Sequence, residues 1–75
     1  MSGKVATANL LRGGEIVYFT VSGEWSKDLQ QARIAPDDGA LLLEEASRGE
    51  EDQIVVSLYL IEVEESGGHL SVLSQ

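Results

Sequence analysis

The chain has no cysteine, one histidine and one proline among its 75 residues. The missing cysteines exclude disulfides and thiolate metal sites, which often stabilise domains of this size. A single histidine makes a histidine-based zinc site implausible. A domain this short buries only about 60–65% of its unfolded surface, so its stability must come from a good core or from self-association. We therefore expect a monomer or a weak homodimer that has no metal and no cofactor.

Long apolar runs are also missing. A membrane-spanning helix requires about 18 or more consecutive apolar residues, and the sequence has no such window. Residues 1–4 lack the apolar core of a signal peptide. These features predict a cytoplasmic protein without membrane contact. Hydrophobic residues nevertheless make up 43% of the chain and fall in patterned runs, which indicates a folded protein. We expect one domain over residues 1–75.

Basic side chains are scarce in the second half of the sequence. Residues 1–34 carry four basic and three acidic side chains, whereas residues 35–75 carry ten acidic side chains and Arg48 alone. The net charges of the two parts are therefore +1 and −9, and that of the chain is −8. Nucleic-acid affinity rests largely on Lys and Arg that neutralise phosphates, so nucleic acid is not an expected partner. A basic protein partner, or a surface that only maintains solubility, is consistent with this charge.

Glycine turns divide the first third of the chain into β-prone runs. Gly13-Gly14 separates Val5–Leu11 from Ile16–Val21, and a second turn precedes Trp25. Glycine reaches positive φ without steric cost, so such turns between β-prone runs favour hairpins. The segment is predicted to form an antiparallel meander whose second strand is central, because both of its faces are largely apolar. Small alanines on one face of the first strand indicate a closely packed neighbour.

The middle of the chain is predicted to be helical. Pro36 suits a first helical turn, and the two aspartates that follow bring negative charge to the positive end of the helix dipole. Gly49 is a natural helix stop, so we expect the helix to run from Pro36 to about Gly49. Residues 29–34 have weaker helical character, with Ser26 as the expected N-cap.

The last third of the chain predicts two further strands. In residues 54–64, an apolar set that includes Tyr59 and Ile61 alternates with a set that includes Glu62. This alternation is typical of a strand with one buried and one wetter face. After a glycine turn, residues 69–73 could return as an edge strand. The order of elements predicts an α+β fold: one antiparallel β-sheet, made of the N-terminal meander and the C-terminal strands, with one or two helices packed on one face.

Few residues suggest catalytic chemistry. Asp37 and Asp38 could form a metal or acid–base pair, but adjacent aspartates at a helix start are far more often caps. His69 has no partner at a recognisable spacing, and an exposed turn residue is the simpler interpretation. The glycine pairs lack the motifs and the strand–loop–helix context of phosphate-binding loops. Without a nucleophile–base pair or a ligand cluster, the sequence predicts a non-enzymatic protein.

Two kinds of residue suggest binding instead. Tyr18, Trp25 and Tyr59 combine apolar rings with polar groups, which are favoured at interfaces and pocket rims, although core packing is the commoner role of aromatic residues. The acidic second half of the chain could form a docking surface. The candidate interaction surface consists of one tryptophan and five glutamates: Trp25, Glu44, Glu45, Glu62, Glu64 and Glu65.

Four motifs together resemble a known family. They are V-x-T-A-N-x-L at Val5–Leu11, G-E-I-V-Y-F-T at Gly14–Thr20, G-E-W-S at Gly23–Ser26 and Y-L-I-E-V at Tyr59–Val63. The family that they resemble is small, bacterial and of unknown function, is found mainly in alphaproteobacteria and is often encoded beside sulfite or nitrite reductase genes. The resemblance implies an accessory protein of assimilatory sulfur or nitrogen metabolism, and it supplies no catalytic or binding residues.

Two functional hypotheses follow. We expect a non-enzymatic accessory or interaction protein that docks onto a basic patch of a reductase through its acidic surface. The alternative is a small-ligand-binding module with a pocket between sheet and helix, near Tyr18, Trp25 and Tyr59. A concave apolar pocket with convergent polar groups would favour the alternative.

Overall fold

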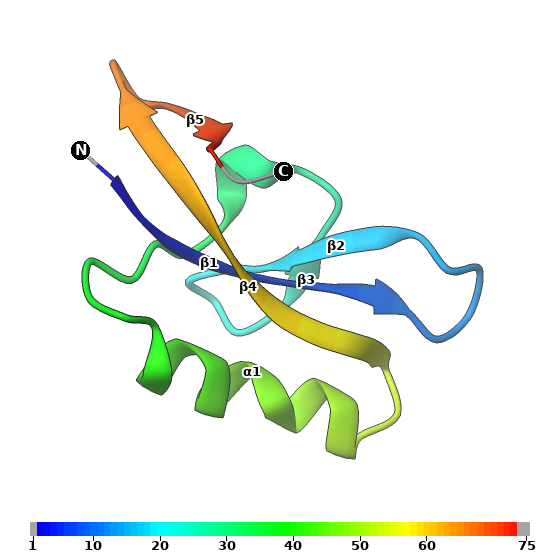
Figure 1. The fold of residues 1–75 in the computed structure, drawn as a ribbon. Helices are drawn as coiled ribbons and strands as arrows, with labels where there is room; N and C mark the ends of the chain where they lie inside the picture. Colours follow the sequence, from blue (N-terminus) through cyan, green and yellow to red (C-terminus); the bar gives the residue numbers. More distant parts are fainter. Residues whose placement is uncertain (1, 74–75) are drawn as a thin grey trace.

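One antiparallel sheet and one α-helix make up the computed structural model, which describes residues 2–73 (Figure 1). The strands are β1 (Ser2–Leu10), β2 (Ile16–Phe19), β3 (Trp25–Ser26), β4 (Val55–Ser66) and β5 (His69–Val72). Their order across the sheet is β3-β2-β1-β4-β5. The helix α1 (Ala40–Glu51) lies along one face of the sheet. The predicted α+β fold is therefore confirmed.

The N-terminal meander forms as the sequence predicts. β1 pairs with β2, and β2 with β3, in antiparallel ladders. The glycines of the predicted turns have φ angles between 57° and 88°, a region that other residues enter at a steric cost. β2 has a strand on each side, as expected of a strand inside the sheet. The middle strand of the five, however, is β1, which lies between β2 and β4.

β1 is covered on both faces. Ala6 packs against Leu42 and Ala46 of α1. On the opposite face, Val5 belongs to a buried cluster with Ala32 and Leu70, which come from the segments that lie over this side of the sheet. Successive strand residues point to opposite faces, so the alanine face of β1 is the face that α1 covers. The small side chains let the helix approach the sheet closely, as the sequence indicated.

The helix begins later than predicted. Its N-cap is Gly39, whose φ is 80°, so Pro36 lies outside the helix. Asp37 and Asp38 precede α1, and their carboxylates accept hydrogen bonds from the N–H groups of Gly39 (2.9 Å) and Ala40 (3.0 Å). Short polar side chains that bind the backbone two residues further on stabilise turns in competition with helix. The two aspartates therefore have a structural role, but they hold the turn that leads into α1 and do not cap the helix itself, whose N-cap is Gly39.

Gly49 lies inside α1 and does not end it. The helix continues to Glu51, and Asp52 is its C-cap. A Cβ atom at position 49 would lie only 2.7 Å from the Nε1 atom of Trp25. Glycine at this position therefore allows the indole to lie against the helix. The sequence signal for a helix stop was wrong, because a tertiary contact explains this glycine.

The second predicted helix is a single 3-10 turn over Leu29–Gln31. Its N-cap is Asp28, whose carboxylate accepts a hydrogen bond from the Gln30 N–H (3.0 Å). Ser26, the predicted cap, lies in β3, and its hydroxyl accepts from the Asp28 N–H instead (3.1 Å). Asp28 therefore caps the 3-10 turn with its own carboxylate, and the Ser26 hydroxyl holds the backbone of Asp28.

The chain after this turn closes one end of the sheet face that points away from α1. Ala35 exchanges two backbone hydrogen bonds with Lys4, both 2.8 Å long. The Gln30 side-chain amide donates to the Leu70 C=O (3.0 Å) and accepts from the Leu70 N–H (2.7 Å). This amide takes the place of a neighbouring strand for β5. The 3-10 turn and β5 therefore lie together on the side of the sheet opposite α1 (Figure 1).

β4 is one long strand that contains a β-bulge. Its register against β1 shifts between Thr7 and Asn9, and Ser57 has a φ of 59°. A bulge of this kind bends the strand and increases its twist. Beyond the bulge, Tyr59 is 50% exposed, whereas Leu60 packs against the cluster under α1. The predicted buried face is therefore wrong at this end of β4, because α1 covers the Leu60 side.

Candidate interaction surfaces

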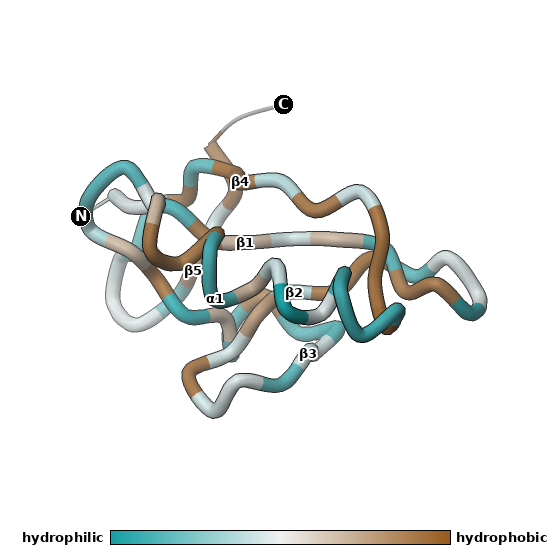
Figure 2. Tube along the Cα trace, turned by 90° about the horizontal axis from the view of Figure 1, so that it is seen from below, coloured by the Kyte–Doolittle hydropathy of each residue, from teal (hydrophilic) through white to brown (hydrophobic). Residues whose placement is uncertain are grey.

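The outer side of α1 is acidic. Leu42 and Ala46 point toward the sheet and are buried, whereas Glu44 and Glu51 are exposed. Residues 37–52 carry seven carboxylates and a single arginine, which gives a net charge of −6. Figure 2, viewed from the side of α1, shows hydrophobic and hydrophilic residues following one another along the chain in this region. The helix and its flanking turns thus carry seven of the thirteen carboxylates of the chain.

Trp25 lies beside an open groove at the C-terminal end of α1. Its ring meets the ring of Phe19 edge-on, with centroids 5.3 Å apart and ring planes at 62°. The groove, about 860 Å³ in volume, is also lined by Glu45 and Arg48. Glu45 forms an ion pair with Arg33, and both side chains are exposed, so the pair adds little stability. The groove combines an aromatic wall with charges of both signs, and this mixture selects no particular class of ligand.

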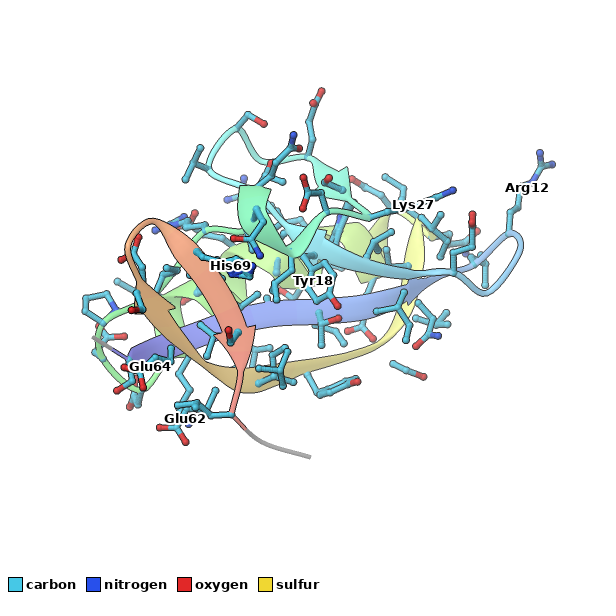
Figure 3. All side chains as sticks on the ribbon, turned by 90° about the horizontal axis from the view of Figure 1, so that it is seen from above. Arg12, Tyr18, Lys27, Glu62, Glu64 and His69 are labelled. Atoms are coloured by element: carbon cyan, nitrogen blue, oxygen red, sulfur yellow. The ribbon has the colours of Figure 1, made fainter. Side chains whose placement is uncertain are left out.

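The remaining glutamates of the predicted surface lie in the half of β4 that follows the bulge. Glu62 and Glu64 share the face of the sheet that α1 covers, whereas Glu65 points to the other face. In Figure 3, Glu62 and Glu64 lie at the opposite end of the molecule from Arg12 and Lys27. The predicted surface therefore spans α1 and β4, and Trp25 adjoins only the α1 part.

The three aromatic residues predicted to share a pocket lie on opposite faces of the sheet. Trp25 and Phe19 are on the α1 side. Tyr18 and Tyr59 are both cross-strand partners of Thr7, and they point away from α1. Figure 3, viewed from that side, shows Tyr18 turned toward the viewer. The predicted pocket between sheet and helix does not form around these three residues.

Tyr18 and Tyr59 line an open hollow of about 410 Å³ on the face away from α1. We call this part of the sheet the tyrosine face, and none of its six residues is charged. Ile16 and Tyr59 are about half exposed here. The sequence does not predict this exposed face, because the alternation of apolar residues in β4 is typical of a strand whose apolar side is buried. The tyrosine face consists of Thr7, Ile16, Tyr18, Tyr59, Ile61 and Val72.

The residues with catalytic potential have structural surroundings. The carboxylates of Asp37 and Asp38 bind the backbone of the turn before α1. His69 is exposed at the turn between β4 and β5. Within residues 2–73, no three His, Asp or Glu side chains gather in an arrangement that could hold a metal ion. The same part of the chain has no helix with the length and apolar character needed to cross a membrane.

Comparison with known proteins identifies the family. A family model described as "Protein of unknown function (DUF2849)" matches residues 4–72. The chain belongs to the DUF2849 family. A search of curated proteins gave no match, and a search of solved structures gave none. The DUF2849 match extends from β1 to β5, so the family corresponds to the whole sheet together with α1, and it assigns no activity to any residue.

Proposed function

We propose that this DUF2849 member is a non-enzymatic interaction protein that docks onto a basic protein surface through the outer side of α1. The observation that carries the proposal is the concentration of negative charge on this one helix and its flanking turns, residues 37–52. The resemblance described above implies a sulfite or nitrite reductase as the first partner to test. Complementary charge on two such surfaces accelerates encounter and selects the partner.

Two exposed carboxylates on the outer side of α1, those of Glu44 and Glu51, are well placed to meet a partner. Among the ion pairs of residues 2–73, only the one between Glu45 and Arg33 engages a carboxylate of residues 37–52. Glu44 and Glu51 are exposed and lie seven residues apart, so they project from the same side of α1 two turns apart. The two carboxylates are about 10 Å apart along the helix axis. This distance is close to the Debye length at 0.1 M salt, so at low salt one basic surface can be attracted by both charges.

A binding assay with matched variants tests the proposal. The purified reductase of the source organism is titrated with the protein at low and high NaCl concentrations. The double variant Glu44→Gln/Glu51→Gln removes two exposed charges from α1, and Glu15→Gln/Glu24→Gln removes two exposed charges elsewhere. We expect a salt-sensitive complex that the α1 variant weakens several-fold and the control leaves nearly unchanged. The absence of a salt-sensitive complex, or equal weakening by both variants, would refute the docking proposal.

A further inference from the structure

The outer edge of β4 is open next to the bulge. β5 pairs with β4 only from Val63 to Ser66, and the Leu73 N–H then donates to the Glu62 C=O (2.9 Å). From Ser57 to Ile61, no strand of residues 2–73 lies on the outer side of β4. Figure 1 shows this part of β4 at the front of the molecule. An open strand edge is a template for pairing with another chain.

The direction of the backbone groups at this edge follows from the ladder. Lys4 and Glu62 are partners across β1 and β4, yet both backbone groups of Lys4 bind Ala35, on the other side of β1. The backbone groups of Glu62 therefore point away from β1. Backbone groups of residues two apart point the same way, so the N–H and C=O of Leu60 also point outward.

One carboxylate from α1 reaches the same edge. The Leu58 N–H lies 3.4 Å from the Oε2 atom of Glu50, a long and weak hydrogen bond. Glu50 thus places negative charge beside the outward-pointing backbone of β4 on the α1 side, where Glu62 also lies. On the other side of the edge, Tyr59 and Ile61 belong to the uncharged tyrosine face.

The two sides of this edge favour different side chains in an added strand. A strand added along it would point alternate side chains toward the tyrosine face and toward Glu50 and Glu62. Apolar residues suit the first direction, and lysine or arginine suits the second. A second copy of this chain suits the edge poorly, because each copy has a net charge of −8 and would bring its own Glu62 toward the same place.

We propose that β4, from Leu58 to Ile61, accepts by strand addition an extended segment of a partner in which apolar and basic residues alternate. Backbone hydrogen bonds supply the affinity in this mode of recognition, and the alternate side chains supply the specificity. The inference rests on the proposed function, because it names the segment that the acidic protein recognises. The sheet is antiparallel throughout, and the added strand is antiparallel to β4.

A peptide of four Lys-Val repeats, acetylated and amidated at its ends, is the probe. In an antiparallel pair, hydrogen-bonded residues face each other and point to the same side of the sheet. The peptide residue that binds Leu60 is therefore a lysine. N-methylation of the lysine backbone nitrogens removes the required donors, whereas N-methylation of the valines blocks only donors that point to solvent. A Glu-Val peptide of the same length is the charge control.

Binding is followed by amide NMR shifts and by hydrogen exchange at Leu60. We expect the lysine-methylated peptide to bind at least about tenfold more weakly than the parent, because its donors to the outward C=O groups of Leu58 and Leu60 are lost. The valine-methylated peptide should bind within about twofold of the parent, and the Glu-Val peptide should not bind. The Leu60 amide should exchange more slowly in the complex. Glu62→Gln should weaken binding more than its matched control, Glu24→Gln.

Other outcomes separate this inference from the proposed function. Equal binding of both methylated peptides, with shifts confined to α1, would overturn strand addition and leave docking through α1 intact. A Lys-Val peptide that does not bind at low salt would also overturn strand addition, while the reductase assay still decides the proposed function. Leu60 shifts that depend on protein concentration without peptide would show that a second copy occupies the edge, which contradicts the inference.

Discussion

Replacing Gly49 with alanine should destabilise the protein, although the same change strengthens most helices. In a helix interior, alanine is favoured over glycine by about 0.8–1 kcal/mol. At position 49, however, the new Cβ atom would lie 2.7 Å from the Trp25 Nε1 and 3.0 Å from its Cε2 and Cζ2 atoms. Non-bonded carbon atoms are comfortable at about 3.5–4.0 Å. Either the indole or the helix must therefore move.

The size of the effect follows from how firmly the indole is held. Trp25 is half-buried and packs edge-on against Phe19, so rotating it away gives up that contact. Overpacking a well-packed site costs about 1–3 kcal/mol, and the gain in helix propensity offsets part of that cost. We expect a net loss of about 1 kcal/mol, which lowers the Tm of a domain this small by about 4–8 °C.

Urea unfolding followed by fluorescence measures both consequences of Gly49→Ala, since Trp25 is the only tryptophan. The unfolding midpoint should fall, and the emission maximum of the folded protein should shift as the ring moves. Glu51→Ala, an exposed change in the same helix, is the control and should leave both nearly unchanged. In a Trp25→Phe background, measured by circular dichroism, Gly49→Ala should cost less or become stabilising. If Gly49→Ala is at least as stable as the native protein and its emission is unchanged, the close-packing explanation is refuted.

Three further predictions concern the core, the β5 contact and the charge of the chain. Leu42→Ala removes a fully buried side chain between α1 and the sheet and should cost about 2–5 kcal/mol, enough to leave much of the protein unfolded in a urea titration. Gln30→Ala removes both hydrogen bonds to Leu70 and should cost about 1–3 kcal/mol, with faster hydrogen exchange at the Leu70 amide than in a Gln31→Ala control. Raising the NaCl concentration from about 20 mM to about 0.5 M should raise the Tm, because screening weakens the self-repulsion of a chain with a net charge of −8, and a decrease would contradict this account.

Local signals in the sequence were reliable wherever a single residue controls its own backbone. The glycines of the three predicted hairpin turns all have positive φ, and the runs between them are strands. A structural role was also predictable for Asp37 and Asp38, which bind backbone N–H groups two residues ahead, although they do so in the turn before the helix. The turns and their approximate positions were predictable, because the preferences of glycine and aspartate arise from sterics and from hydrogen bonds within a few residues.

Signals that depend on distant contacts were misread. Gly49 has the features of a helix stop, but it accommodates Trp25, a residue 24 positions earlier in the chain. Tyr59 has the alternation of a buried strand residue, yet α1 covers the other face of β4 at this point, so Tyr59 is half exposed. Neither outcome can be deduced from a local pattern, because each depends on which element packs over which face.

The α+β class, the turns of the meander and the concentration of acidic residues after position 34 can all be inferred from the amino-acid sequence. Composition and short-range preferences are enough to decide these properties. The positions of Trp25 and the two tyrosines on opposite faces follow from the three-dimensional packing, as does the edge of β4 that no strand of residues 2–73 covers. Strand order and helix placement depend on the packing of segments far apart in the chain, and this packing decides which residues lie next to each surface.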